Sequence, residues 1–171
     1  MHTYPESELV RIFQRYGELP HTYRLAKRIV QVRNSQALDT TDKLNAAVAD
    51  IAPRKDANAW MAQLYQALRI EVNGELMDLE KLLSSAERLL KPGGVLAMLT
   101  YHSLEDRLVK HLMLSGNLEG ERRTDFYGNP LNPWKPLFRK PLMPSPEEVE
   151  RNPRARSAKL RAAEFQPVSQ S

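Results

Sequence analysis

The chain has 171 residues, of which 42% are hydrophobic, and this is enough for a packed core in one domain or two small ones. It contains no cysteine, which excludes disulfides, thiolate zinc sites, iron–sulfur clusters and a cysteine nucleophile. The formal net charge is +4, and residues 135–161 hold eight Lys or Arg against three Glu. Such a basic segment indicates a polyanionic partner (RNA, DNA or phosphate), although a solvated basic face has the same composition.

The sequence shows no sign of a membrane segment. The longest apolar run is Val95 to Leu99, well short of the roughly 20 residues that a membrane helix requires. The first residues carry neither a basic stretch nor an apolar signal core. We therefore expect a cytoplasmic protein with no membrane partner, and the oligomeric state stays open.

Apolar residues recur at helical spacing through the first half of the chain. The pattern predicts a helix after the caps at Asp39–Thr41, with Pro53 as its stop, and a helix that carries leucines from Leu76 to Leu90. It also predicts helices over residues 6–17, 22–33 and about 58–72. We assign residues 1–60 to an all-helical domain. Residues 61–171 form a second domain with a connecting helix, a strand over 95–101 and the basic tail.

The run from Val95 to Tyr101 differs from the helical stripes because it is almost continuously apolar and follows a Pro-Gly-Gly turn. That pattern favours a strand buried on both faces, as in a parallel sheet. A helix then follows, with Ser103 as its expected cap and Asp106 closing a capping box. The helix–strand–helix order of residues 76–114 predicts the α/β class with an open sheet.

The last third of the chain is rich in proline, with eight of the twelve prolines between Pro130 and Pro167. We expect a loop over residues 115–136 and a strand near Leu137–Leu142. A short helix is predicted after Ser145, with Pro146 first and Glu148 in the capping box. Residues 157–165 are predicted as a last strand, with a helix as the alternative by propensity.

Polar side chains gather where the strand 95–101 ends, and open α/β sheets bind their ligands at this position. An imidazole there can transfer protons near neutral pH, a carboxylate can accept a hydrogen bond from an amine or hydroxyl, and Arg107 can pair with a phosphate. A well-capped helix with carboxylates at its positive end would carry the same residues. The catalytic candidates are His102, Ser103, Glu105 and Asp106.

Two further sets of residues are candidates for binding. Alternating basic residues could line one side of an extended segment and contact phosphates, or form a basic surface strand; they are Arg151, Arg154, Arg156, Lys159 and Arg161. Gln66, Arg69 and Asn73 share one helical face. They would support an active site or form a structural polar network.

The sequence also lacks several common motifs. It has no Gly-x-Gly, so the glycine loops that bind dinucleotides, methyl donors or nucleotide phosphates are missing. It has no Gly-x-Ser-x-Gly elbow, and its four histidines lack metal-ligand spacing. We therefore expect neither cofactor-binding residues nor a metal site in this chain.

Four segments in order resemble the RsmH (MraW) family: QALRIEVNGEL (66–76), LKPGG (90–94), YHSLEDRLVK (101–110) and RNPRARSAKLR (151–161). Members of that family are S-adenosylmethionine-dependent methyltransferases that act on N4 of a cytidine in 16S ribosomal RNA. The family's His-Ser-Leu-Glu-Asp-Arg motif is intact here, and Tyr65 replaces its usual aromatic. The resemblance implies a partial Rossmann-like methyltransferase sheet and 16S ribosomal RNA, or the small ribosomal subunit, as partner.

The resemblance covers only the C-terminal part of the family. The family's glycine-rich donor loop and its Asp-Leu-Gly-Val-Ser-Ser-type strand end have no counterpart in this sequence. The resemblance implies that residues 6–60 are the family's helical insertion, that residues 76–165 complete its sheet, and that the complete enzyme uses S-adenosylmethionine. Three hypotheses follow: a piece of the methyltransferase that is inactive alone, a non-catalytic RNA-binding module, and a structural piece that needs the other half to fold.

Overall fold

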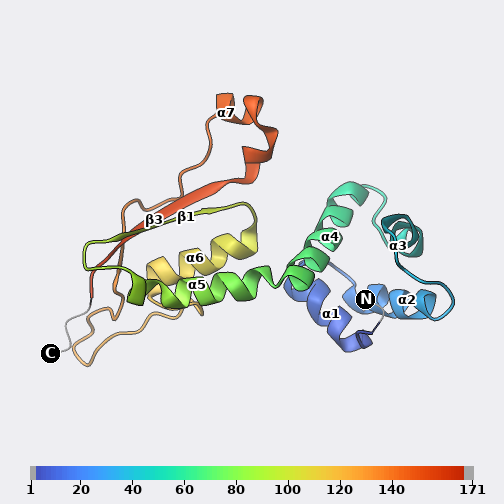
Figure 1. Ribbon diagram of the computed structural model, residues 1–171, viewed down its shortest axis with the longest axis horizontal. Coiled ribbons are helices and arrows are strands. Elements are labelled where there is room, and N and C mark those ends of the chain that lie inside the picture. Colours follow the sequence, from blue (N-terminus) through green and yellow to red (C-terminus); the bar gives the residue numbers. More distant parts are fainter. Residues whose placement is uncertain (1–2, 168–171) are drawn as a thin grey trace. The chain divides into compact units, whose positions relative to one another are not determined.

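The computed structural model describes residues 3–167 and consists of two compact units, one up to Glu75 and one from Leu76. No helix within the described residues is long and apolar enough to cross a membrane. The first unit contains α1 (Glu6–Arg15), α2 (Thr22–Arg33), α3 (Thr41–Val48) and α4 (Ala57–Asn73) (Figure 1). The next elements are α5 (Glu75–Leu89), β1 (Val95–Thr100), α6 (Ser103–Ser115), β2 (Trp134–Pro136), α7 (Pro146–Arg151), the 3-10 helix η1 (Pro153–Ser157) and β3 (Lys159–Phe165).

The helices of the first unit form where apolar spacing predicts them. Thr40 caps α3 as expected, because its hydroxyl accepts a hydrogen bond from the Lys43 N–H at 3.3 Å. The helix ends at Val48 rather than at Pro53, since the Val48 carbonyl accepts from the Ile51 N–H (2.9 Å) in a tighter turn. The core of this unit includes Trp60 and Leu64 of α4. The unit therefore extends to Glu75, whereas the sequence suggested a division at residue 60.

The second unit contains a three-stranded antiparallel sheet in the order β1-β3-β2. β3 is the central strand because both β1 and β2 pair with it. Its register with β1 pairs Val95 with Glu164 and Thr100 with Lys159. Residues 159–165 are thus a strand, as predicted, and the helix alternative is wrong. The expectation of a parallel sheet is also wrong for the strands of this unit.

β2 lies at Trp134–Pro136, just before the range Leu137–Leu142 in which the sequence predicted a strand. Only the two ends of the predicted range bond to β3: the Leu137 N–H donates to Ala162 and the Leu142 N–H donates to Leu160, each at 2.9 Å. The chain bends at residues 137–140, and Pro141 has no N–H to donate. The short helix α7 forms as predicted, with the Ser145 hydroxyl accepting from the Glu148 N–H at 3.2 Å.

β1 is covered on one face only, which corrects the prediction of a strand buried on both faces. Leu96 and Met98 pack against a core built from α5, α6, β2 and β3, with Leu83, Val109 and Trp134 at its centre. The side chains that alternate with them are open to solvent, with Val95 48% and Leu99 53% exposed. β1 is also an edge strand, because β3 is its single partner among the described strands. Figure 1 shows α5 and α6 running along the covered face.

We expect Leu83→Ala to lower the free energy of unfolding by about 2–5 kcal/mol, because it leaves a cavity in the core of the second unit. Leu83 is fully buried, whereas Leu89 on the same helix is 71% exposed. Leu89→Ala is therefore the matched control and should change the free energy of unfolding by less than about 0.5 kcal/mol. Urea denaturation followed by circular dichroism measures both, and equal losses would contradict the placement of α5.

Candidate functional site

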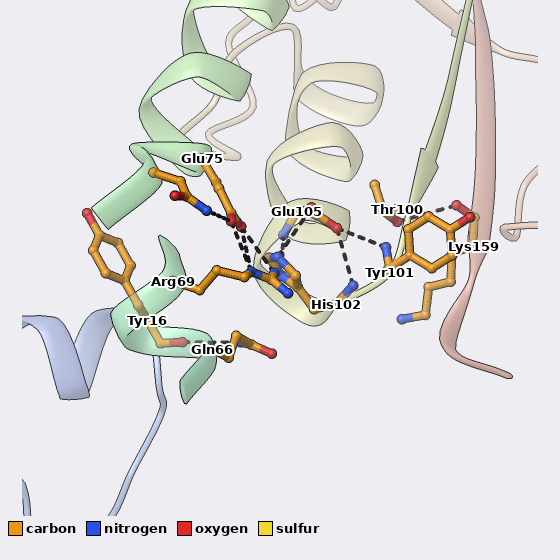
Figure 2. Close-up of polar contacts among 10 residues, drawn as sticks. Tyr16, Gln66, Arg69, Glu75, Thr100, Tyr101, His102, Glu105 and Lys159 are labelled. Atoms are coloured by element: carbon orange, nitrogen blue, oxygen red, sulfur yellow. Dashed lines mark hydrogen bonds and ion pairs between the residues drawn. The ribbon is translucent and has the colours of Figure 1, made fainter. Parts of the chain in front are cut away.

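The turn between β1 and α6 holds the polar residues that the sequence singled out. His102 has extended backbone angles (φ −139°, ψ 165°) and is the N-cap of α6, where its Nδ1 accepts from the Glu105 N–H at 3.4 Å. Glu105 Oε2 in turn accepts from the backbone N–H groups of Tyr101 (2.8 Å) and His102 (3.3 Å), as Figure 2 shows. This reciprocal capping box corrects the predicted pair of Ser103 and Asp106. The pair shifts by one residue because Ser103 is already helical.

Glu105 is an ionised acceptor at the carboxyl end of β1. Burial acts to raise its pKa, but hydrogen bonds from His102 and from the Tyr101 N–H outweigh it and hold the pKa below the ordinary value. His102 Nε2 is a buried nitrogen that lies 3.3 Å from Glu105 Oε1 and faces this carboxylate.

Asp106 is engaged by two cations of β3. Its oxygens accept from Arg161 Nε (2.7 Å) and Nη2 (3.1 Å) and from Lys159 Nζ (3.3 Å). Burial acts to raise the pKa of Asp106, but the hydrogen bonds and charge of Arg161, together with Lys159, outweigh it and lower the pKa. Both oxygens of this carboxylate therefore already have partners, and it joins the first turn of α6 to β3.

The basic residues between positions 151 and 161 do not line one extended segment, which corrects that prediction. Arg151 ends α7, Arg154 and Arg156 lie in η1, and Lys159 and Arg161 begin β3. The two residues of β3 bind Asp106, and the Arg161 side chain is only 13% exposed.

The other basic candidates lie on the surface. Arg151 is exposed and approaches Glu148 at 3.4 Å. Arg154 and Arg156 are also exposed, and within the described part of the chain neither makes a hydrogen bond or ion pair. Arg107 is exposed on the first turns of α6. The predicted RNA-binding set therefore separates into two partly buried cations that pair with Asp106 and four surface cations.

In the first unit, Gln66, Arg69 and Asn73 bond to nearby groups of that unit, and Figure 2 shows the bonds of Gln66 and Arg69. Gln66 Nε2 donates to the Tyr16 carbonyl at 3.2 Å. Arg69 Nε and Asn73 Nδ2 both donate to Glu75 Oε1 at 2.9 Å. This is the structural polar network that the sequence left open as one alternative.

The glycines before β1 do not form a methyl-donor site. The Gly93 N–H donates to the Phe165 carbonyl and the Gly94 N–H to the Lys91 carbonyl, each at 2.8 Å, so both donors are used within the fold. They also lie at the amino end of β1, opposite the polar turn. In residues 3–167 there is no group of three His, Asp or Glu side chains that could hold a metal ion.

Tyr101 and Asn152 are two surface residues that the sequence did not single out as binding candidates. Both line a groove at the carboxyl end of β1. An exposed aromatic directly after an apolar strand is the signal that could have identified Tyr101. Nothing local marks Asn152, because its place depends on how residues 142–158 fold back on the sheet.

Residues 1–166 match the model of a protein family described as the MraW methylase family. The chain belongs to this family. It is 46% identical over 164 residues to "Ribosomal RNA small subunit methyltransferase H" of Bacteroides thetaiotaomicron. This alignment covers 96% of this chain and 54% of that protein. Proteins of the same name from Amoebophilus asiaticus (45% over 164 residues, 96% and 53%) and Flavobacterium johnsoniae (46% over 161 residues, 94% and 53%) are similar. The chain spans about half the length of these curated relatives.

Acid should weaken the second unit through Asp106. Because its pKa is lower in the folded chain, its stabilising contribution is complete above the ordinary carboxyl pKa of about 4 and disappears as the pH falls through the lower folded value. Asp106→Asn should lower the free energy of unfolding at pH 7 by about 3–5 kcal/mol, because it leaves Arg161, whose side chain is only 13% exposed, without its charge partner. It should also flatten the pH dependence below about pH 4.

Urea denaturation at pH 7 and pH 3 measures both effects. The control is Asp78→Asn, which removes an exposed carboxylate that pairs with Lys81 at 3.0 Å on α5. This change should cost less than about 1 kcal/mol. Equal losses in the two variants would show that the Asp106 cluster does not stabilise the fold.

Proposed function

We propose that this chain is the acceptor-side part of an S-adenosylmethionine-dependent methyltransferase that methylates N4 of a cytidine in 16S ribosomal RNA. The observation that carries the proposal is the 46% identity over 164 residues to a ribosomal RNA small subunit methyltransferase, of which the chain covers 54%. The N–H groups of Gly93 and Gly94 are already used within the fold and do not form a methyl-donor site. We therefore place the donor site in the part of the enzyme that this chain does not span. On this proposal the chain is inactive alone, and a ribosomal substrate implies the cytoplasm.

The exposed side of β1 supports this division of the enzyme. β1 is apolar along both faces, yet Val95 at its amino end remains half exposed and one edge of the strand has no partner in residues 3–167. Apolar edges of this kind are normally paired or covered in a finished sheet. We infer that the rest of a Rossmann-like sheet pairs with this edge and that residues 76–165 complete it.

Within the enzyme, the proposed role of this chain is to align the amine of the target base. The exocyclic amine of cytosine is a weak nucleophile because its lone pair is delocalised into the ring, so alignment and a hydrogen-bond acceptor supply the catalysis. We assign the acceptor role to Glu105, whose Oε2 is fixed by two backbone N–H groups while Oε1 faces His102. His102 is then a positioning residue, and Ser103 lies beside both at the start of α6. Asp106 supports the site by anchoring α6 to β3.

The surface cations are the proposed contacts to RNA. Phosphates would lie against Arg107, Arg151, Arg154 and Arg156, which fixes the position of the RNA strand without reading its sequence. Lys159 and Arg161 act through Asp106 instead. The target base would have to be unstacked or presented in a loop to reach the end of β1. Gln66, Arg69 and Asn73 would support the first unit, the family's helical insertion, as a second RNA contact.

A non-catalytic RNA-binding module is the second candidate function. It is favoured by the exposed arginines of η1 and by the absence of a glycine loop in the sequence. The two candidates predict different results when this chain is combined with the part of the enzyme that it does not span. A non-catalytic module would still not methylate small ribosomal subunits.

The chain alone should not bind S-adenosylmethionine, because its two backbone donors before β1 are already used within the fold. Isothermal titration calorimetry at protein concentrations that detect micromolar affinity should give no saturable heat. Circular dichroism on the same sample verifies that the chain is folded. Saturable binding would show that a donor site exists within this chain and would overturn the proposed division.

Arg154→Ala combined with Arg156→Ala should weaken binding of single-stranded RNA and reduce its salt dependence. Each lost phosphate contact lowers the slope of log affinity against log salt by about 0.7, so the double variant should lose about 1.4. Fluorescence anisotropy with a labelled oligonucleotide measures the slope. Arg88→Ala with Lys91→Ala removes the same charge from exposed positions at the amino end of β1 and should change the slope little. An equal change in both variants would refute a specific contact at η1.

A further inference from the structure

A groove of about 300 Å³ lies on the exposed face of the second unit, at the carboxyl end of β1. Leu99 and Tyr101 come from the end of β1, and Leu160 comes from the start of β3, where the register pairs it with Leu99. The other side of the groove is built from residues 142–144 and from the α7–η1 segment, including Glu148 and Asn152. Its volume lies at the lower end of the range for sites that hold small organic groups.

The groove combines a flat aromatic surface with a few polar groups. Tyr101 is half exposed, and its ring has apolar neighbours in Leu99 and Leu160. The side chains of Tyr101 and Asn152 make no hydrogen bond within residues 3–167, so both can bind a ligand. An amide offers both donors and an acceptor, which is the combination that reads the edge of a nucleobase.

The charge around the groove selects the class of ligand. Residues 139–157 carry five Lys or Arg against three Glu. Glu148 is the charged side chain in the groove lining, and it pairs with Arg151 at 3.4 Å. Arg154 and Arg156 are the sequence neighbours of Ala155, which also lines the groove, and both guanidinium groups lack partners within the described residues. An apolar floor for a ring beside unpaired cations suits a base joined to phosphates. A purely apolar peptide would leave these cations unmatched.

We propose that this groove takes one unpaired nucleotide of the RNA, with its base stacked on Tyr101 and its phosphates at Arg154 and Arg156. The proposal rests on the proposed function and adds a specific subsite to it. The groove lies next to the Glu105 turn, because Tyr101 both lines the groove and donates its backbone N–H to Glu105 at 2.8 Å. The nucleotide held there is therefore a neighbour of the target base, and it would hold the RNA strand in place while the target is extruded.

The test measures affinity for a fluorescently labelled single-stranded RNA oligonucleotide by anisotropy, at low salt, with the whole chain. Tyr101→Ala should weaken binding about 5- to 150-fold, the range that base–aromatic stacking contributes. Tyr101→Phe keeps the ring and should stay within about twofold of the unmodified chain. Tyr127→Ala is the matched control, since it removes an exposed tyrosine of the same unit that does not line the groove. Because Tyr101 is half exposed, its truncation should leave the circular dichroism spectrum unchanged.

The outcomes separate this proposal from the proposed function. If replacing Arg154 and Arg156 by Ala weakens RNA binding but Tyr101→Ala does not, the RNA contact stands and the groove is not a nucleotide site. Equal losses for Tyr101→Ala and Tyr127→Ala would overturn the proposal as well, because stacking would then be unspecific. A chain that binds no RNA at low salt would overturn both. Loss for Tyr101→Ala alone, with rescue by Tyr101→Phe, supports the subsite.

Discussion

The second unit depends on one buried carboxylate. Asp106 lies in the first turn of α6 and binds Lys159 and Arg161 of β3, which are 53 and 55 residues away from it in sequence. β3 is the central strand, and β1 and β2 pair only with it within residues 3–167. An ion cluster in this place therefore determines where α6 begins relative to the whole sheet. The geometry of the turn from Tyr101 to Glu105 follows from that anchor.

Two adjacent carboxylates have different partners because successive side chains of the helix point in different directions. Asp106 faces the cations of β3 and is ionised as a structural group. Glu105 faces back to the end of β1, where two backbone N–H groups hold one oxygen and His102 approaches the other. Sequence alone presents the two as equivalent. The distinction arises from cross-chain partners, and it favours Glu105 for contact with a substrate amine.

Local signals in the sequence predicted much of the fold. Apolar spacing located the helices of both units, Thr40 and Ser145 were correct as caps, and the apolar run after Gly94 was a strand. The errors concern partners that lie far away in sequence. The antiparallel direction of β3, the shift of β2 to Trp134 and the pairing of Arg161 with Asp106 depend on contacts across the sheet. The cap at His102 was missed because serine is the commoner capping residue, while here the backbone is still extended one residue before it.

The order of the strands has a consequence for synthesis of the chain. β1 emerges long before β3, yet its register partners run from Lys159 to Glu164. During translation its apolar side chains therefore remain without these partners until residues 159–164 have been made, and an unpaired apolar edge is prone to aggregation. The helices of the first unit, including the contact between Arg11 of α1 and Glu71 of α4, have their partners within residues up to Glu75 and can pack before β3 is made. A ribosome that stalls before residue 159 would release a folded helical unit joined to an unprotected strand.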